Sequence, residues 1–126
     1  MTKHIVSTEH APKAIGPYSQ AVQQAEMLFV SGQLPLNPAT GKLADGIEAQ
    51  TQQCLENIKA ILTAAGSDLS KVVKTTIFLK DLDNFQVVNQ IYGSYFTESY
   101  PARSTVQIAR LPLEAAVEIE AIATIQ

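Results

Sequence analysis

This chain of 126 residues is 46% hydrophobic and 17% charged, and it contains a single cysteine, Cys54. Its net charge of −3 and its lack of any basic run exclude the electrostatic footprint of a nucleic-acid-binding protein. One cysteine cannot form an intramolecular disulfide, no apolar stretch approaches the ~20 residues of a membrane helix, and no apolar segment of a secretory signal follows Met1. We therefore expect a cytoplasmic protein whose residues 1–126 form one domain.

The first third of the chain predicts strands separated by stiff loops. The predicted strands in this part lie at residues 3–8, 18–23 and 27–32. Residues 24–26 are the predicted hairpin turn, and loops rich in proline and glycine occupy residues 11–17 and 34–41. Gly32 closes the third strand, where the missing Cβ atom allows close approach of a ligand or another chain.

The first predicted helix begins at Asp45 and runs to about Ala65. Asp45 followed by Glu48 fits a capping box, and Gly66 fits a left-handed residue at the end of the helix. The apolar residues that recur at helical spacing and predict its buried stripe are Leu55, Ile58, Ile61, Leu62 and Ala65.

Residues 72–80 are β-branched and mostly apolar, which is typical of a central strand. A second helix is predicted to open at residues 83–86 and to end at Tyr100-Pro101. Its buried stripe is predicted to contain Phe85, Val88, Tyr92, and Tyr95 or Phe96, with Asn89 on the margin.

The C-terminal part predicts two strands that carry opposite charges. In residues 101–112, alternation places Arg103 and Thr105 on one face, and Leu111-Pro112 is predicted to stop the strand because proline cannot donate to a ladder. Residues 117–125 follow as a strand with Glu118 and Glu120 on one face. We expect these two strands to be neighbours joined by a short turn.

The predicted order is therefore β-β-β-α-β-α-β-β. Runs of strands broken by two helices indicate an α+β fold, a mixed sheet with both helices on one face. The strands are too apolar to leave the other face in water, so we expect subunits to pack against it.

Residue types alone leave the chemistry open. Arg103 suits bidentate binding of a carboxylate, but on spacing alone a structural ion pair with Glu118 or Glu120 is the commoner role of such an arginine. The two glutamates either split their roles, with one paired to Arg103 and the other transferring protons, or form a solvated edge. Other polar residues with both a functional and an ordinary structural interpretation are Tyr18, Ser31, Asn89 and Thr105.

Other chemistries find no support in the pattern. His4 and His10 have no cysteine or carboxylate cluster near them in the sequence to complete a metal site. Cys54 lies inside the first predicted helix, where packing explains it better than nucleophilic chemistry. With no glycine-rich nucleotide loop in the sequence, we expect neither a metal nor a cofactor.

Five blocks of sequence, spread over nearly the whole chain, resemble the RidA/YjgF family. These blocks are residues 14–21, 31–35, 73–78, 101–104 and 118–121. The resemblance implies a chorismate-mutase-like α+β fold and a homotrimer whose sheets line a central barrel, with ligand sites in clefts between subunits. It also implies metal-independent hydrolysis of reactive 2-imino acids, released by pyridoxal-phosphate-dependent dehydratases, to 2-oxo acids and ammonia.

The resemblance also assigns roles to individual residues. Arg103 would hold the substrate carboxylate, and Glu118 would orient or activate water. The substrate-binding positions would be Tyr18, Ser31, Gly32, Asn89, Arg103 and Thr105. Many members have cysteine where this chain has Thr105. Two alternatives stay open: a non-catalytic regulator that binds 2-oxo acids in the same cleft, and a ribonuclease, which the acidic balance of the chain disfavours.

Overall fold

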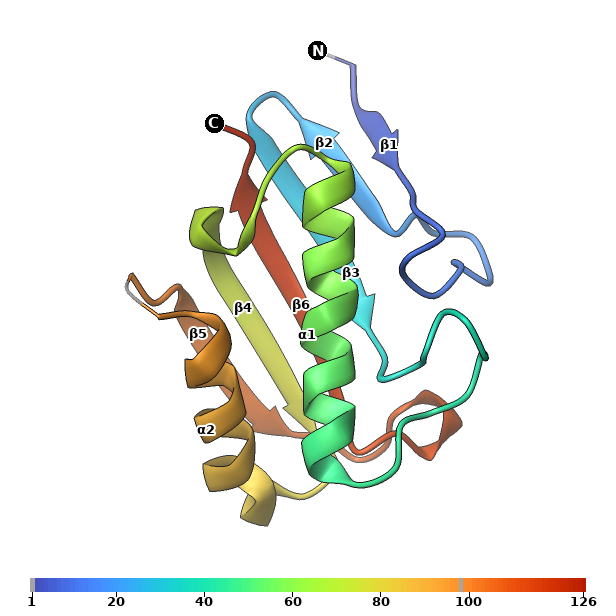
Figure 1. Cartoon of the computed structure of the whole chain (residues 1–126), viewed down its shortest axis with the longest axis vertical. Helices are drawn as coiled ribbons and strands as arrows, with labels where there is room; N and C mark the ends of the chain where they lie inside the picture. Colours follow the sequence, from blue (N-terminus) through green and yellow to red (C-terminus); the bar gives the residue numbers. More distant parts are fainter. Residues whose placement is uncertain (1, 98) are drawn as a thin grey trace.

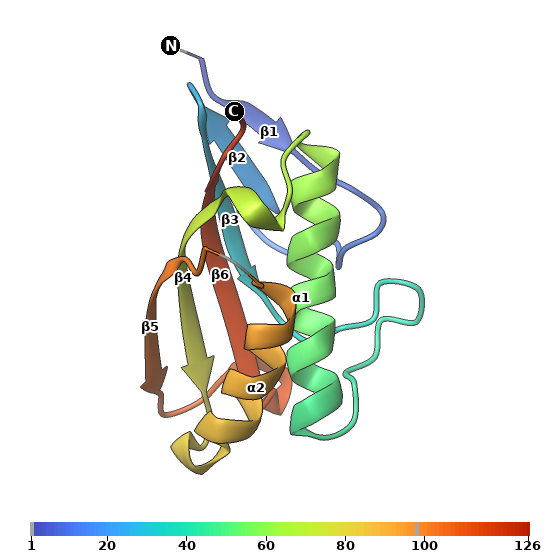
Figure 2. The ribbon, with the colours of Figure 1, turned by 60° about the vertical axis from the view of Figure 1, so that its left-hand side comes forward.

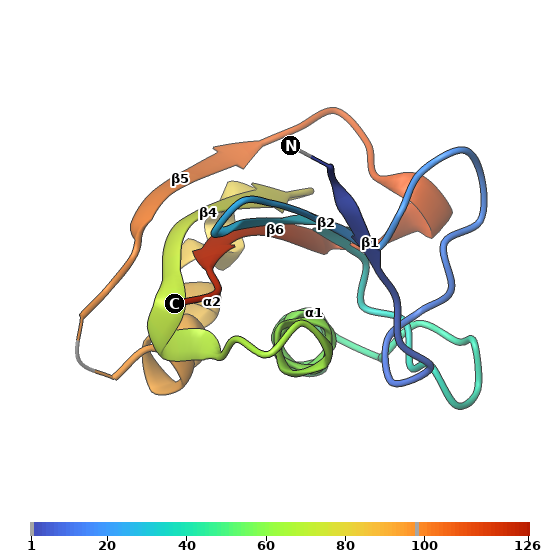
Figure 3. The same cartoon turned by 90° about the horizontal axis from the view of Figure 1, so that it is seen from above.

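Six strands form one twisted sheet, and two helices lie across one of its faces (Figure 1). The computed structural model describes residues 2–97 and 99–126. The strands span His4–Val6 (β1), Ala21–Gln24 (β2), Met27–Gln33 (β3), Val72–Leu79 (β4), Ala102–Gln107 (β5) and Val117–Thr124 (β6). The helices span Ile47–Ala64 (α1) and Phe85–Tyr95 (α2). The predicted order of elements and the placement of both helices on one face are confirmed, as the view from above shows (Figure 3).

The strand order across the sheet is β1-β2-β3-β6-β4-β5, so the last strand in the chain lies in the middle. β4 and β5 run parallel, and all other neighbours are antiparallel. The prediction that the arginine strand neighbours the glutamate strand is wrong, because β4 lies between them and pairs with both. A strand parallel to β4 cannot reach β6 through a tight hairpin, so residues 108–116 cross the end of β4. β5 accordingly ends at Gln107, well before Leu111-Pro112.

A glycine lies at each end of α1. Gly46 is the N-cap residue with a φ of 88°, and no side chain caps the helix, so the predicted capping by Asp45 is wrong. At the other end, Ala65 is the C-cap and Gly66 follows it with a φ of 79°, which confirms the predicted left-handed glycine. The N–H of Ser67 then donates to the carbonyl of Leu62 at 2.8 Å, which completes a Schellman ending. Neither helix of the described residues is long and apolar enough to span a membrane.

α2 begins where predicted but ends at Tyr95, before the predicted Tyr100-Pro101. The helix packs beside α1 on the same side of the sheet (Figure 2). Val88, Tyr92 and Phe96 of its predicted stripe are buried, while Phe85 is half-buried.

The hydrophobic core lies between the sheet and the two helices. Its largest fully buried side chains include those of Leu28, Leu55, Ile58, Ile61, Leu62, Ile77, Leu79, Val88, Val117 and Ile119. On the opposite sheet face no described element provides a cover, and Phe29 and Val106 remain 46% and 42% exposed there. Packing of subunits on this face stays a prediction.

Candidate functional site

Arg103 leaves β5 on the face of the sheet that carries the helices. Its guanidinium carbon lies 5.0 Å from the centre of the Tyr92 ring and 5.6 Å from that of Phe85, and both rings belong to α2. Among the described residues, the guanidinium makes no ion pair with a carboxylate and donates no hydrogen bond. Within one chain Arg103 therefore pairs with neither Glu118 nor Glu120. Its N–H donors are free to bind an anion.

A cleft of about 400 Å³ opens beside this arginine. Asn89, Tyr100 and Pro101 line it together with Arg103. Thr105 follows on the same face of β5, and its hydroxyl is buried without a hydrogen-bond partner among the described residues. An unpartnered buried hydroxyl costs about 1–3 kcal/mol. Thr105 therefore offers a polar contact to a ligand or a neighbouring chain.

Glu118 lies on β6, and its side chain projects from the sheet face opposite the helices. Its carboxylate sits directly over Gly32 of β3, because a Cβ atom at position 32 would lie only 2.8 Å from Cδ of Glu118. The ladder between β3 and β6 is irregular between Val30 and Gln33, where β3 bends past this carboxylate. Burial, followed by repulsion from Glu120, raises the pKa of Glu118. No described residue donates a hydrogen bond to the Glu118 carboxylate.

Tyr18 and Ser31 line the same cleft as Gly32 and Glu118, which has a volume of about 600 Å³. The hydroxyl of Ser31 donates to the carbonyl of Ser19 at 2.6 Å, so the proton of Ser31 is committed to the backbone. Tyr18 is 51% exposed at the rim. Glu120 lines the cleft as well, so the structure brings together five of the residues that the sequence singled out.

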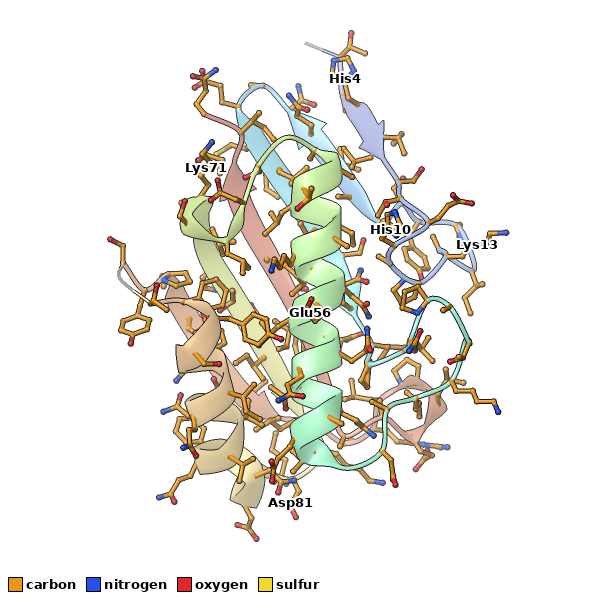
Figure 4. The ribbon with its side chains drawn as sticks, viewed as in Figure 1. His4, His10, Lys13, Glu56, Lys71 and Asp81 are labelled. Carbon is orange, nitrogen blue, oxygen red and sulfur yellow. The ribbon has the colours of Figure 1, made fainter. Side chains whose placement is uncertain are left out.

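Gln20 is a positioning residue that the sequence analysis missed. Its buried amide accepts from the N–H of Thr8 at 2.7 Å and donates to the carbonyl of Pro12 at 2.8 Å. These bonds fasten the N-terminal loop beside the cleft, where Lys13 points outward (Figure 4). A glutamine in a strand-like run carries no sequence signal for this role.

The turn after β5 forms another wall of the Glu118 cleft, and the sequence analysis missed it as well. Leu113 lies there, 59% exposed, and both Leu113 and Glu114 adopt left-handed backbone with φ near 60°. Glu114 is paired with Arg110 at 3.0 Å and with Lys80 at 3.6 Å, and its pKa is lowered chiefly by the hydrogen bond from Arg110. The ion pairs thus brace a strained turn beside the cleft.

The predicted site residues fall into two groups on opposite faces of the sheet. Thr75 of β4 is in register with Arg103, whereas Phe78 is in register with Glu118. Because alternate residues of a strand point to opposite faces, Arg103 and Glu118 point away from each other within one chain. One group supplies hydrogen-bond donors that have no partner among the described residues, and the other supplies a carboxylate with a raised pKa.

Comparison with known proteins agrees with the sequence resemblance. Residues 8–125 match the family model described as Endoribonuclease L-PSP. The 2-iminobutanoate/2-iminopropanoate deaminase of Salmonella typhimurium is 51% identical over 121 residues, which cover 94% of each protein. The chain therefore belongs to the RidA/YjgF family.

Solved structures of relatives share the fold over nearly the full chain. The structure of the YjgF gene product of Escherichia coli has a TM-score of 0.95 at 48% identity, covering 98% of this chain and 99% of that one. The structure of E. coli TdcF with bound serine has a TM-score of 0.92 at 44% identity, covering 96% and 98%. The α+β fold is thus that of the family.

Proposed function

We propose that this protein hydrolyses 2-imino acids to 2-oxo acids and ammonia. The observation that carries the proposal is the half-buried guanidinium of Arg103, which has neither an ion pair nor a hydrogen bond among the described residues. A relative at 51% identity is named 2-iminobutanoate/2-iminopropanoate deaminase, and the TdcF structure contains serine, another small molecule with an α-carboxylate. The net charge of −3 disfavours a polyanionic substrate such as RNA.

Arg103 would hold the carboxylate of the imino acid through two parallel charge-assisted hydrogen bonds. The unpartnered hydroxyl of Thr105 and the amide of Asn89 lie on the same side of the sheet and would complete the polar contacts. Binding by these groups fixes the C=N carbon of the substrate in place, and positioning of this kind lowers the barrier without a covalent intermediate.

Glu118 would act as the general base. Its raised pKa lets it accept a proton more readily than an ordinary glutamate, and among the described residues its carboxylate has no hydrogen-bond or ion-pair partner to displace first. As Glu118 removes a proton from water, the oxygen bonds to the iminium carbon and the C=N electron pair moves to nitrogen. Glu118 returns the proton to the nitrogen, and the carbinolamine then collapses to the 2-oxo acid and ammonia as its hydroxyl proton passes to the Glu118 carboxylate.

Arg103 and Glu118 can reach the same substrate only if they come from different subunits. Arg103 and Glu118 lie on opposite faces of one sheet, so one chain cannot direct both at the same substrate. We propose a homotrimer in which the Arg103 cleft of one subunit faces the Glu118 cleft of the next. The exposed Phe29 and Val106 on the uncovered sheet face support burial of that face between subunits.

A coupled assay tests the proposed function. A serine/threonine dehydratase generates the imine in the reaction mixture, and formation of the 2-oxo acid is followed with and without this protein. We expect the protein to increase the rate in proportion to its concentration, above the unaided hydrolysis of the imine. A well-folded oligomer that leaves the rate unchanged would overturn the proposal.

Gly32→Ala is expected to lower the hydrolysis rate by about tenfold or more, because general-base catalysis depends on placement. The new Cβ atom would meet the Glu118 carboxylate at about 3 Å, so Glu118 has to move from the place where it serves as base. The measurement is the initial rate in the coupled assay. Gly41→Ala is the control, because a Cβ atom at this exposed position meets nothing within 4 Å; alanine at its φ of 73° should cost stability and leave the hydrolysis rate unchanged. Equal rates for wild type and Gly32→Ala would contradict the role given to Glu118.

A further inference from the structure

Arg103 is held by an aromatic clamp, by which we mean the rings of Phe85 and Tyr92. The two residues lie about two turns apart on α2, so their side chains share one face of the helix. The guanidinium carbon lies 5.6 Å and 5.0 Å from the two ring centres. These rings are the only groups of the described chain that hold the guanidinium, since it has no ion pair or hydrogen bond there.

Tyr92 is itself fixed in place. It is only 3% exposed, and its hydroxyl shares a hydrogen bond of 2.6 Å with the hydroxyl of Thr75, which is 1% exposed. The ring of Phe96 lies 4.6 Å from it, centre to centre. Thr75 is in register with Arg103 on the adjoining strand, so the hydrogen bond ties α2 to the sheet next to the arginine. The ring therefore cannot swing away from the guanidinium without breaking a buried hydrogen bond.

The aromatic clamp reduces the side-chain entropy that Arg103 loses when it binds a carboxylate. A free arginine side chain carries about 2 kcal/mol of rotamer entropy, and part of that entropy is lost when the side chain binds a ligand. A cation–π contact contributes about 0.5–2 kcal/mol, depending on burial, and so restricts the guanidinium before any ligand arrives. The N–H donors lie in the plane of the guanidinium and are not used by contacts to ring faces. They stay available to the carboxylate.

We propose that Phe85 and Tyr92, with Thr75 behind Tyr92, are positioning residues that pre-order Arg103 for a carboxylate ligand. This inference rests on the proposed function, because it assigns Arg103 to the substrate carboxylate. The clamp acts on affinity for the carboxylate group and not on the bond-making step, which takes place at the imine carbon. Its loss should raise KM and leave kcat nearly unchanged.

Phe85→Leu is the main test, because it removes an aromatic face at a half-buried position and keeps an apolar side chain of similar bulk. We expect the Kd for 2-oxobutanoate and the KM for the imine to rise about fivefold, with kcat within about twofold of wild type. The inhibition constant of 2-oxobutanamide, which lacks the carboxylate, should stay unchanged. Tyr92→Phe keeps the ring but removes the bond to Thr75, and it should shift the same two constants in the same direction.

Val88→Ala is the matched control, because Val88 is buried on α2 but is not one of the groups around Arg103. It should lower thermal stability and leave both ligand constants unchanged. Wild-type affinity for 2-oxobutanoate in Phe85→Leu overturns the inference, and so does an equal loss for the acid and the amide, which indicates a purely structural role. Arg103→Ala separates the two proposals: if it binds 2-oxobutanoate like wild type, the proposed carboxylate role fails. If it loses binding while Phe85→Leu does not, only the clamp fails.

Discussion

Glu118→Gln should abolish turnover while leaving the binding of 2-oxobutanoate close to wild type. The substitution keeps the size of the side chain but removes the base, and general-base catalysis contributes about 10²-fold or more. Arg103→Ala should lose both functions, with binding weakened by about 100-fold, because the carboxylate loses its charge-assisted hydrogen bonds. The coupled assay measures turnover, and calorimetry measures binding. This pair of variants separates a deaminase from a regulator that only binds 2-oxo acids.

Matched controls exist for both substitutions. Glu56→Gln alters an exposed carboxylate on α1 (Figure 4) and keeps an acceptor for the hydroxyl of Tyr95, and Lys59→Ala removes an exposed cation from the same helix, away from both clefts. Both should keep activity.

The wild-type rate should also fall as the pH drops through the pKa of Glu118, and because this pKa is raised the fall begins at a higher pH than for an ordinary glutamate. Turnover that persists in Glu118→Gln would contradict the role of Glu118 as the general base.

Mixing inactive Arg103→Ala subunits with inactive Glu118→Gln subunits should restore activity. If each site takes Arg103 from one subunit and Glu118 from the next, a hybrid trimer contains one cleft in which both residues are intact. Random mixing in equal amounts should therefore give about a quarter of the wild-type activity, because heterologous interfaces in a closed ring are equivalent. The two variants are unfolded together, refolded, and assayed.

Each variant refolded alone provides the baseline, and wild type carried through the same treatment provides the maximum. The mixture should also regain activity after co-expression, where no refolding step is involved. A mixture as inactive as its components, in the presence of demonstrated hybrid oligomers, would show that each site belongs to a single chain. That result would contradict the separation of Arg103 and Glu118 onto opposite sheet faces.

Local sequence patterns were enough to predict the elements of this fold but not their neighbours. The apolar spacing of Leu55, Ile58 and Ile61 identified α1 and its buried side, because helical periodicity is a local property. Nothing local indicates that β6 enters between β3 and β4, since strand pairing depends on residues far apart in the chain. The start of α1 was misassigned for a different reason: the helix begins one residue later than expected, so the N-cap position falls on Gly46, which has no side chain to cap it.

In the candidate site, too, the residue types were predictable from the sequence but their positions in space were not. Arg103 and Glu118 were recognisable from their residue types and family resemblance, and the charged group of each has no hydrogen-bond or ion-pair partner in the described part of the chain. They lie on opposite faces because Arg103 is in register with Thr75 of β4, whereas Glu118 is in register with Phe78 of the same strand. The residue pattern of a single strand carries no information about this register. The clamp was likewise hidden: the helical stripe placed Phe85 and Tyr92 in the core, and only the packing of α2 on β5 brings their rings to the arginine.

The central position of β6 has a consequence for how the chain acquires its structure. Among the described strands β6 comes last in sequence, yet it is their only link in the ladder between the β1–β3 meander and the β4–α2–β5 unit. Until it arrives, both units present unpaired strand edges to the solvent, and such edges promote aggregation. We therefore expect the sheet to close only after β6 has been synthesised, in a slow step dominated by contacts distant in sequence. Truncation before Val117 should yield insoluble protein and not a smaller folded domain.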